Sequence, residues 1–536
     1  MIVGAGPTGL ALALWLTRLG VAVRIIDKAA EPGTTSRALA VQARTLEFYR
    51  QVGVADALVA GGVEVAGLNL WAKGARAARV PIRELGEGLS PYPFPLIHPQ
   101  DAHERLLIER LGALGVKVDR GTELIGLDRE AGRVRAVLRP PGGGEETCDA
   151  AYLAGCDGAS STVRGALGID FSGGTYAGLF YVADVEATGP PTDGELHIDL
   201  EDADFVIVFP MKGRGRVRLV GTTREAARGG QGLSFEDVRG RAIANLKLDV
   251  ARVNWFSTYH VHHRVASRFR EGRAFLLGDA AHIHSPVGGQ GMNTGIGDAV
   301  NLAWKIAAVL EGKAPTALLD TYEPERIAFA RRLVATTDRV FTIVTRRGPL
   351  ARAVRTGLVP LVLPSLFRLP PLRRFLFHTV SQIDVNYRGS PLSRGVAGRV
   401  HGGDRLPWVE TAPGQDNFAP LEALAWQVHV YGDPGPVVEE ACSELGLPLH
   451  AFAWQPRMRR AGLERGSLYL VRPDGYVALA DPEAAPERLR EYQKAWAPTS
   501  ALGGGEARTS GQGDRGPGHR AEPRRADPAG ADRHRT

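Results

Sequence analysis

The pattern of apolar and polar positions in the first thirty residues predicts a strand, a helix and a second strand. An apolar run begins at Met1, the helix is expected over Leu10–Leu19, and the second strand over Val21–Ile26. Glycines separate the first strand from the helix, as in a βαβ unit of a parallel sheet. Because only three residues precede Gly4 and a strand usually has about five, we expect the first strand to begin upstream of Met1.

Mixed helix and strand patterns continue to residue 170 and return after residue 265. Between residues 175 and 265 the apolar positions instead alternate with a period of two, which predicts antiparallel strands with one buried face. The fold class is therefore α/β, with a sheet inserted into a discontinuous nucleotide-binding domain. The expected elements are helices at Asp101–Leu114 and Asp298–Leu310 and strands at Lys117–Asp119, Val134–Leu138, Ala151–Ala154, Phe205–Phe209, Val217–Thr222, Trp255–Val261 and Ala274–Leu277.

A third region follows a connector rich in proline and arginine, and a Gly-, Pro-, Ala- and Arg-rich tail ends the chain. The turn tripeptide Pro473-Asp474-Gly475 predicts a hairpin in the third region. Its other expected elements are strands at Trp426–Tyr431 and Leu449–Phe452 and a helix at Val437–Leu445. The predicted boundaries are 1–174 and 266–345 for the discontinuous domain, 175–265 for the inserted sheet, 346–380 for a helical connector, 381–500 for the third domain and 501–536 for a disordered tail.

The composition is that of a soluble globular protein, with 44% apolar and 23% charged residues among 536. The net charge is +6, but the tail carries seven arginines and five acids, so the rest of the chain is nearly neutral. No basic stripe with interleaved aromatic residues is evident, which disfavours nucleic acid as a partner. The three cysteines, Cys148, Cys156 and Cys442, predict neither a disulfide framework nor a metal site and fit a cytoplasmic location.

The most apolar later segment, Gly357–Phe367, is too short for a transmembrane helix and contains Pro360 and Pro364. Arginines flank it on both sides. We expect a helix that packs on its own domain, with a peripheral membrane contact as the alternative.

The glycines between the first strand and the helix form a dinucleotide-binding pattern, Gly4-Ala5-Gly6-Pro7-Thr8-Gly9. Gly4 would make the turn, Gly6 would let a pyrophosphate approach the backbone, and Gly9 would allow close helix packing. The positive end of the helix would face the phosphates. Asp27, at the end of the second strand, is placed to accept hydrogen bonds from ribose hydroxyls.

Two further motifs, together with the first, resemble those of the class A FAD-dependent aromatic hydroxylases. They are Gly155-Cys156-Asp157-Gly158-Ala159-Ser160-Ser161-Thr162-Val163-Arg164 and Gly278-Asp279-Ala280-Ala281-His282-Ile283-His284-Ser285-Pro286-Val287-Gly288-Gly289-Gln290-Gly291-Met292-Asn293. The order and spacing of the three motifs match the family over about 330 residues. The resemblance is to the branch of phenol and polyketide hydroxylases in particular. The resemblance implies a Rossmann-like FAD-binding domain, an inserted substrate domain and a C-terminal thioredoxin-like domain. Because Cys442 is the only cysteine of that last domain, it has no CxxC motif.

The same resemblance implies cofactor-binding residues. Asp279 would meet the ribityl chain of FAD, the backbone of Gly291, Met292 and Asn293 would meet the isoalloxazine edge, and Pro286 and Val287 would lie between flavin and substrate. The full set of expected cofactor-binding residues is Gly4, Gly6, Gly9, Asp27, Arg37, Gln100, Asp157, Gly158, Asp279, Pro286, Gly289, Gly291, Met292 and Asn293. Asp157 and Asp279 could instead be ordinary turn or cap residues.

The resemblance implies a monooxygenase that hydroxylates an aromatic, phenolic or polyketide-like molecule with NADH or NADPH and O2, through a flavin C4a-hydroperoxide. No second glycine fingerprint follows a strand, which disfavours an enzyme with a separate NADPH domain. The resemblance implies that NADPH or NADH binds only transiently. The alternatives are an FAD-linked dehydrogenase or reductase without oxygen incorporation, and a flavin protein that sequesters an aromatic compound. A homodimer is possible.

No catalytic acid or base is evident in the sequence, because the flavin would carry the chemistry. Candidates for the substrate pocket are Tyr181, Phe209 and His262, besides Pro286 and Val287. His260, His262 and His263 are close in sequence, but on a strand only His260 and His262 share a face, and no metal-ligand spacing is present. They are ordinary strand histidines in the preferred interpretation, with His262 as the one that would help to ionise a phenol. His282 is expected to be structural.

Overall fold

In the computed structural model, residues 1–34, 38–200, 206–223, 233–238, 240–285, 288–344, 348, 352–366 and 369–496 are described. Their first layer is a six-stranded sheet in the order β18-β19-β12-β1-β2-β8, in which only β18 is antiparallel to its neighbour. The predicted βαβ unit is confirmed, because β1 and β2 pair in parallel on either side of α1. The strands are β1 (Ile2–Val3), β2 (Ile25–Asp27), β8 (Val118–Arg120), β12 (Leu153–Gly155), β18 (Arg270–Glu271) and β19 (Ala274–Leu276).

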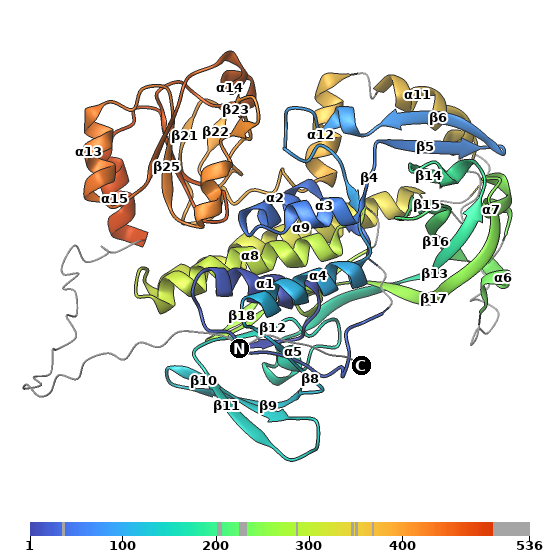
Figure 1. Ribbon diagram of the computed structural model, residues 1–536, viewed down its shortest axis with the longest axis horizontal. Helices are drawn as coiled ribbons and strands as arrows, with labels where there is room; N and C mark the ends of the chain where they lie inside the picture. The colour runs from blue at the N-terminus through green and yellow to red at the C-terminus, as the bar shows by residue number, and fades with distance from the viewer. Residues whose placement is uncertain are drawn as a thin grey trace, which may run out of the picture. The chain divides into compact units, whose positions relative to one another are not determined.

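Helices α1 (Pro7–Arg18), α4 (Gln100–Ala113) and α8 (Gly291–Leu310) lie side by side next to this sheet (Figure 1). Helix α8 begins seven residues before the predicted start at Asp298. The glycines in its first two turns disfavour a helix in the sequence pattern, yet the packing of the helix requires them. A Cβ at Gly295 would lie 2.3 Å from Thr8 Oγ1, so only glycine allows α8 to approach the start of α1 this closely.

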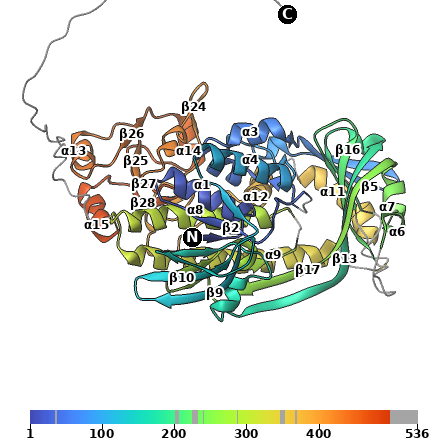
Figure 2. The same cartoon turned by 60° about the horizontal axis from the view of Figure 1, so that its bottom comes forward.

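The second layer is an eight-stranded sheet in the order β20-β17-β13-β16-β15-β14-β5-β6. Its two longest strands, β13 (Phe171–Thr188) and β17 (Asp249–Ala266), pair along most of their length and run past α9 in Figure 2. The remaining strands are β5 (Gly67–Ala72), β6 (Ala75–Pro81), β14 (Leu196–Asp199), β15 (Val206–Pro210), β16 (Arg216–Thr223) and β20 (His282–Ile283).

This sheet is wider than the predicted segment 175–265. Strands β5 and β6 come from the first part of the chain, and β5 pairs with β14 in parallel. A parallel pair requires a long connection, here more than a hundred residues, and such a pairing leaves no local pattern in the sequence. The sheet also continues at both ends, since β13 starts at Phe171 and β17 ends at Ala266.

Smaller elements complete this part of the chain. A three-stranded sheet of β9 (Glu123–Glu130), β10 (Arg133–Arg139) and β11 (Glu146–Ala150) is separate from one formed by β3 (Ala40–Val41), β7 (Leu96–Ile97) and β4 (Val63–Glu64). The other helices are α2 (Ala43–Gln51), α3 (Ala55–Gly61), η1 (Arg83–Leu85), α5 (Thr162–Ala166), η2 (Pro190–Thr192), α6 (Phe235–Val238), α7 (Arg241–Asn245), η4 (Gly278–Ala280), η5 (Thr316–Thr321) and α9 (Tyr322–Val344).

The connector folds into η6 (Val354–Leu358), α11 (Val359–Leu366) and α12 (Pro370–Val380). It packs on elements from the first part of the chain: α11 contacts β6 and α12 contacts η1. Within the described ranges, no helix is both long and apolar enough to cross a bilayer.

The C-terminal part is a six-stranded mixed sheet in the order β22-β21-β28-β27-β25-β26. The predicted hairpin is confirmed by the antiparallel pairing of β27 with β28, and β25 pairs with β26 in parallel across α13. The elements are β21 (Arg394–Ala397), β22 (Val400–His401), β23 (Glu410–Ala412), β24 (Gln415–Asp416), η7 (Ala419–Ala423), β25 (Gln427–Tyr431), α13 (Pro436–Glu444), β26 (Leu449–Phe452), α14 (Pro456–Ala461), β27 (Leu468–Val471), β28 (Val477–Asp481) and α15 (Pro486–Trp496).

A buried charge cluster joins the C-terminal hairpin to α8 and α9. The Glu325 carboxylate accepts hydrogen bonds from Lys305 Nζ (2.7 Å) and from Arg472 Nη1 (2.9 Å), and none of the three side chains is exposed. Asp474, in the hairpin turn, accepts a hydrogen bond from Trp304 Nε1 at 3.0 Å. Burial alone would raise the pKa of Glu325, but Arg472 and Lys305 more than offset it and hold that pKa below its ordinary value.

We predict that Glu325→Leu lowers the stability of the protein by about 3–5 kcal/mol, because it leaves Lys305 buried without its carboxylate and removes one of the two carboxylates that pair with Arg472. The thermal unfolding midpoint measures this loss. Glu483→Ala is the control: Glu483 pairs with Arg488 at the surface, and such pairs contribute at most about 1 kcal/mol. Equal midpoints for the two variants would contradict the prediction.

Candidate functional site

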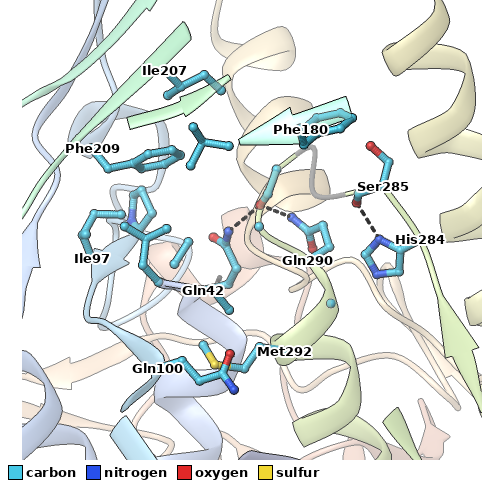
Figure 3. Close-up of a pocket in the computed structure, with 18 of the residues that line it drawn as sticks. Gln42, Ile97, Gln100, Phe180, Ile207, Phe209, His284, Ser285, Gln290 and Met292 are labelled. Atoms are coloured by element: carbon cyan, nitrogen blue, oxygen red, sulfur yellow. Dashed lines mark hydrogen bonds between the residues drawn. The ribbon is translucent and has the colours of Figure 1, made fainter. Parts of the chain in front are cut away.

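A cavity of about 1170 Å³ lies between the six-stranded and the eight-stranded sheets. Its floor contains the loops that follow β1, β12 and β19, represented by Gly6, Gly158 and Asp279. These loops lie at the carboxyl ends of neighbouring parallel strands, where α/β sheets bind their ligands. Figure 3 shows part of the lining, with Gln100 and Met292 on one side and Phe180, Ile207 and Phe209 on the other.

The glycines of the first loop differ in what surrounds them. A Cβ at Gly4 would lie 2.3 Å from Cys156 O, and one at Gly9 would lie 2.0 Å from Gly4 O, so both positions require glycine for packing. A Cβ at Gly6 would meet nothing within 4 Å, and Gly6 lines the cavity. The start of α1 has no side-chain cap, so its amides can bind an anion. This loop therefore has the space and the donors that a pyrophosphate needs.

Asp27 ends β2 beside this loop but does not line the cavity. Its Oδ2 accepts a hydrogen bond from Ala5 N (2.7 Å) and its Oδ1 from Ala29 N (2.8 Å), and Arg120 Nη1 lies 3.9 Å from Oδ2. A carboxylate has about four lone-pair sites, so hydroxyls can still bind to it. Its predicted contact with a ribose stays a prediction.

Asp157 and Gly158 have different roles in the structure. Asp157 accepts hydrogen bonds from Ser161 Oγ (2.5 Å) and Val163 N (3.0 Å), so it holds the start of α5. Gly158, with φ of 79°, lines the cavity. The carboxylate thus acts as a helix cap in this structure, the alternative that the sequence left open, and the cavity wall is formed by the neighbouring glycine.

Asp279 is exposed in the cavity wall, and the loop that carries it is fixed from behind by Asp298. The Asp298 carboxylate accepts hydrogen bonds from Gly278 N (3.0 Å), His282 Nε2 (2.7 Å) and Arg326 Nε (2.5 Å). Burial would raise the pKa of Asp298, but Arg326 and His282 hold it below the ordinary value. His282 therefore has a structural partner, as its position in the motif predicted.

The glycine-rich loop before α8 is held by three glutamine side chains (Figure 3 shows two of them). Gln42 Nε2 and Gln290 Nε2 both donate to Gly288 O, each at 3.0 Å. Gln382 Nε2 donates to Gln290 Oε1 at 2.6 Å. Because Gly288 and Gly289 both have positive φ, these bonds hold a backbone conformation that most other residues resist.

Asn293 fixes the first turn of α8. Its Nδ2 donates to Ala40 O (2.9 Å) and Gly289 O (2.8 Å), and its Oδ1 accepts from Gln42 N (2.9 Å) and Thr45 Oγ1 (2.8 Å). The side chain is therefore fully used within the protein. A ligand beside this turn would meet the backbone amides of α8, which has no side-chain cap at its N-terminus.

The roof of the cavity is apolar and comes from the eight-stranded sheet. Phe209 lines it, as predicted, but Tyr181 does not. Successive side chains of a strand point to opposite faces, so Phe180 faces the cavity while Tyr181 packs beneath the sheet against Phe256. The prediction of Tyr181 was wrong by one residue. The sequence showed that side chains alternate along the strand, but it did not show which of the two faces lines the cavity.

Of the clustered histidines, His260 and His262 line the cavity. His262 Nδ1 lies 2.7 Å from Thr175 Oγ1, and burial together with Arg264 lowers the pKa of His262. His263 instead packs its ring on Tyr176, 4.9 Å between ring centroids. Among the described residues, no cluster of three potential metal ligands is present.

His284 also lines the cavity, although the sequence gave it no role. Its Nδ1 lies 2.8 Å from Ser285 O, and because a carbonyl only accepts, Nδ1 carries the proton (Figure 3). Burial lowers the pKa of His284 to about 4, so the ring is neutral at ordinary pH.

Of the fourteen expected cofactor residues, the structure describes twelve, and seven of these line the cavity. Gly6, Gln100, Gly158, Asp279, Gly289, Gly291 and Met292 line it, whereas Gly4, Gly9, Asp27, Asp157 and Asn293 support its loops from behind. Arg37, Pro286 and Val287 lie outside the described residues. Sequence reasoning missed Gln42 and Gln382, which no local motif marks, and passed over Gln290 and His284, although both stand inside the third motif.

Comparison with known proteins gives one consistent result. The family model described as "FAD binding domain" matches residues 1–337. The chain is 36% identical over 510 residues to 6-methylpretetramide 4-monooxygenase from Streptomyces rimosus (89% of this chain, 90% of the relative), and 33% identical to pentachlorophenol 4-monooxygenase from Sphingobium chlorophenolicum (77% and 76%). The solved structure of the OxyS anhydrotetracycline hydroxylase from Streptomyces rimosus is similar with a TM-score of 0.74 and 30% identity, over 93% of this chain and 98% of that one. The chain therefore belongs to the FAD binding domain family and is an FAD-dependent aromatic monooxygenase.

Proposed function

We propose that this enzyme hydroxylates a phenol with several fused rings, of the polyketide type, using NADH or NADPH and O2. The observation that carries the proposal is the apolar roof over the flavin-binding loops. About 1170 Å³ is more space than a single phenol ring needs beside the flavin ring. The similarity to a 6-methylpretetramide 4-monooxygenase and to an anhydrotetracycline hydroxylase supports the same substrate class.

The roof favours flat, apolar ligands. Its side chains include Phe180, Leu196, Ile207, Phe209, Val220, Trp255 and Tyr259. Aromatic and branched side chains of this kind contact the faces and edges of fused rings, and they exclude water. Exclusion of water from the site keeps activated oxygen from being lost before it reaches the substrate.

We infer that FAD is held by the residues named from the three motifs. Gly6 and the start of α1 would hold the pyrophosphate, Asp27 the adenosine ribose, Asp279 the ribityl chain, and the amides of Gly291–Asn293 the isoalloxazine edge. Support comes from the open space at Gly6 and from the uncapped N-terminus of α8. When bound, FAD supplies the electron transfer and the activation of O2. The proposed set also includes three residues that shape these loops from behind, Gly4, Gly9 and Asp157. It is completed by Arg37, Gln100, Gly158, Pro286, Val287, Gly289 and Met292.

Among the chain's own residues, His262 is proposed to accept the proton of the substrate hydroxyl. It lines the cavity, and its lowered pKa keeps it neutral near pH 7, the form that can accept a proton. Removal of the proton makes a phenol ring more electron-rich and so more reactive toward an electrophilic oxygen.

We further propose that the C-terminal region, 381–500, is a thioredoxin-like domain with a structural role. The strand order β28-β27-β25-β26, with one parallel pair across a helix and one hairpin, supports this fold. The only cysteine there, Cys442, is buried, which supports a structural role over redox chemistry. We also propose the predicted boundaries of the other described domains, and a homodimer. The predicted tail, 501–536, lies outside the described residues.

The proposed reaction predicts that one atom of O2 enters the product. Oxidation of NADPH or NADH by the purified enzyme should rise with a fused-ring phenol such as a naphthol or anthracenol, and mass spectrometry after reaction under 18O2 should find one labelled oxygen in the product. Peroxide release must be subtracted from the consumption of the reduced cofactor. An unlabelled product would indicate a dehydrogenase, and a single-ring phenol turned over equally well would contradict the proposed substrate size.

The assignment of Asp279 predicts weaker FAD binding in Asp279→Ala, because the carboxylate would lose its hydrogen bonds to ribityl hydroxyls. A charged hydrogen bond contributes about 1.5–3 kcal/mol, so the dissociation constant should rise by roughly 10- to 150-fold. Titration of the apoprotein with FAD, followed by flavin fluorescence, measures it. Asp56→Ala, in the first turn of α3, is the control. Equal FAD affinity of Asp279→Ala and the wild type would remove Asp279 from the site.

The assignment of His262 predicts a pH profile. For the phenol, kcat/KM should fall as the pH drops through the pKa of His262, which lies below the ordinary 6.5. His262→Asn should remove this limb and lower kcat/KM by on the order of 100-fold, at the lower end of general-base effects. His263→Asn should keep the limb, since His263 faces Tyr176. A limb that survives in His262→Asn would assign it to another group.

A further inference from the structure

The connector exposes an unusual concentration of large apolar side chains. Of the twelve large apolar side chains that are exposed in the described part of the chain, seven lie between residues 354 and 380. Leu361 and Phe375 are the most exposed, at 74% and 64%. The seven are Val354, Leu358, Leu361, Val362, Leu369, Phe375 and Val380, and we call them the connector surface. Exposed apolar groups gathered in this way mark a contact with another surface.

The same segment is strongly basic. Residues 339–383 contain eight arginines and neither aspartate nor glutamate, although the chain as a whole has nearly equal numbers of basic and acidic residues. Arg374 is exposed on α12 beside Phe375, and its neighbour Arg373 approaches Glu84 of η1 at 3.8 Å. In the sequence, the apolar side chains therefore lie within a stretch of positive net charge.

The helices of the connector pack on two elements that are adjacent in the chain, β6 and η1. Helix α11 contacts β6, and α12 contacts η1, which follows β6 directly (Figure 1). The region also borders the cavity, because Val380, 43% exposed, and Arg355 both line it.

We propose that the connector surface docks on an anionic phospholipid bilayer. Apolar side chains would enter the boundary between headgroups and acyl chains, and the arginines would bind the lipid phosphates. The connector would lie in the plane of the membrane, because α11 and α12 have only 8 and 11 residues and cannot cross it. A second copy of the chain is a less suitable partner for this surface. Its connector is equally rich in arginine and contains no aspartate or glutamate, so like charges would oppose contact between two connector surfaces.

Docking in this position would place the cavity next to a lipid phase, in which apolar aromatic compounds dissolve. The idea that the substrate enters from the bilayer depends on the proposed function. Binding to lipid does not, because it can be measured without substrate or turnover.

The test uses the full-length protein loaded with FAD and vesicles of phosphatidylcholine, with or without phosphatidylglycerol. Flotation should recover the wild type with the anionic vesicles and not with phosphatidylcholine alone, and added salt should weaken the binding. The double variant Leu361→Gln/Phe375→Gln should partition at least about ten-fold less, from the loss of buried apolar area. Arg374→Gln should partition about five-fold less at low salt.

Two matched controls separate this surface from general effects. Val437→Gln replaces an exposed valine of α13, and Arg110→Gln an exposed arginine of α4, and both should bind vesicles like the wild type. Unchanged flavin content shows that each variant is folded. The proposal is overturned if the wild type does not bind anionic vesicles or if the double variant binds equally well. It is also overturned if, in the absence of vesicles, the wild type is a dimer and the double variant is a monomer. A second copy of the chain would then cover the connector surface.

Discussion

Helix α8 is the element on which both the cofactor loops and the C-terminal region depend, and hydrogen bonds within the protein fix it at both ends. At its start, the Asn293 side chain uses all its polar atoms on the backbone and on Thr45. Near its other end, Trp304 donates to Asp474 of the C-terminal hairpin, and Lys305 donates to Glu325 of α9. Buried polar groups cost free energy unless they are paired, so this helix can adopt only the position in which all of these partners are present.

The same constraint extends to the loop before α8, which contains Gly288 and Gly289. Gly288 and Gly289 adopt positive φ angles, which would cost little to change in isolation. The amides of Gln42, Gln290 and Gln382 hold the loop, and Gln382 itself adopts φ of 61°, a conformation that costs a non-glycine residue free energy. Backbone amides at the start of α8 thereby keep a fixed direction toward the cavity, which is what stabilisation of negative charge requires.

The cavity combines a polar floor and an apolar roof because two sheets of different kinds meet there. The parallel sheet contributes loops at the carboxyl ends of its strands, and the mostly antiparallel sheet contributes one face of its side chains. A flavoprotein monooxygenase needs both, since the cofactor must be held by donors and carboxylates while its reactive edge must be kept dry. The histidines of β17 are among the polar groups on the roof side.

The elements and motifs that depend on local spacing could be predicted from the sequence. Gly4, Gly6 and Gly9 marked the βαβ unit, and the segment from Gly278 to Asn293 marked the cofactor loop, because turns and helix starts are set by neighbouring residues. The sequence could not show the pairing of β5 with β14 or the contact of Gln382 with Gln290. It also could not show that Phe180, and not Tyr181, faces the cavity. These depend on residues far apart in the chain, and no local pattern records which distant backbone or side chain becomes the neighbour.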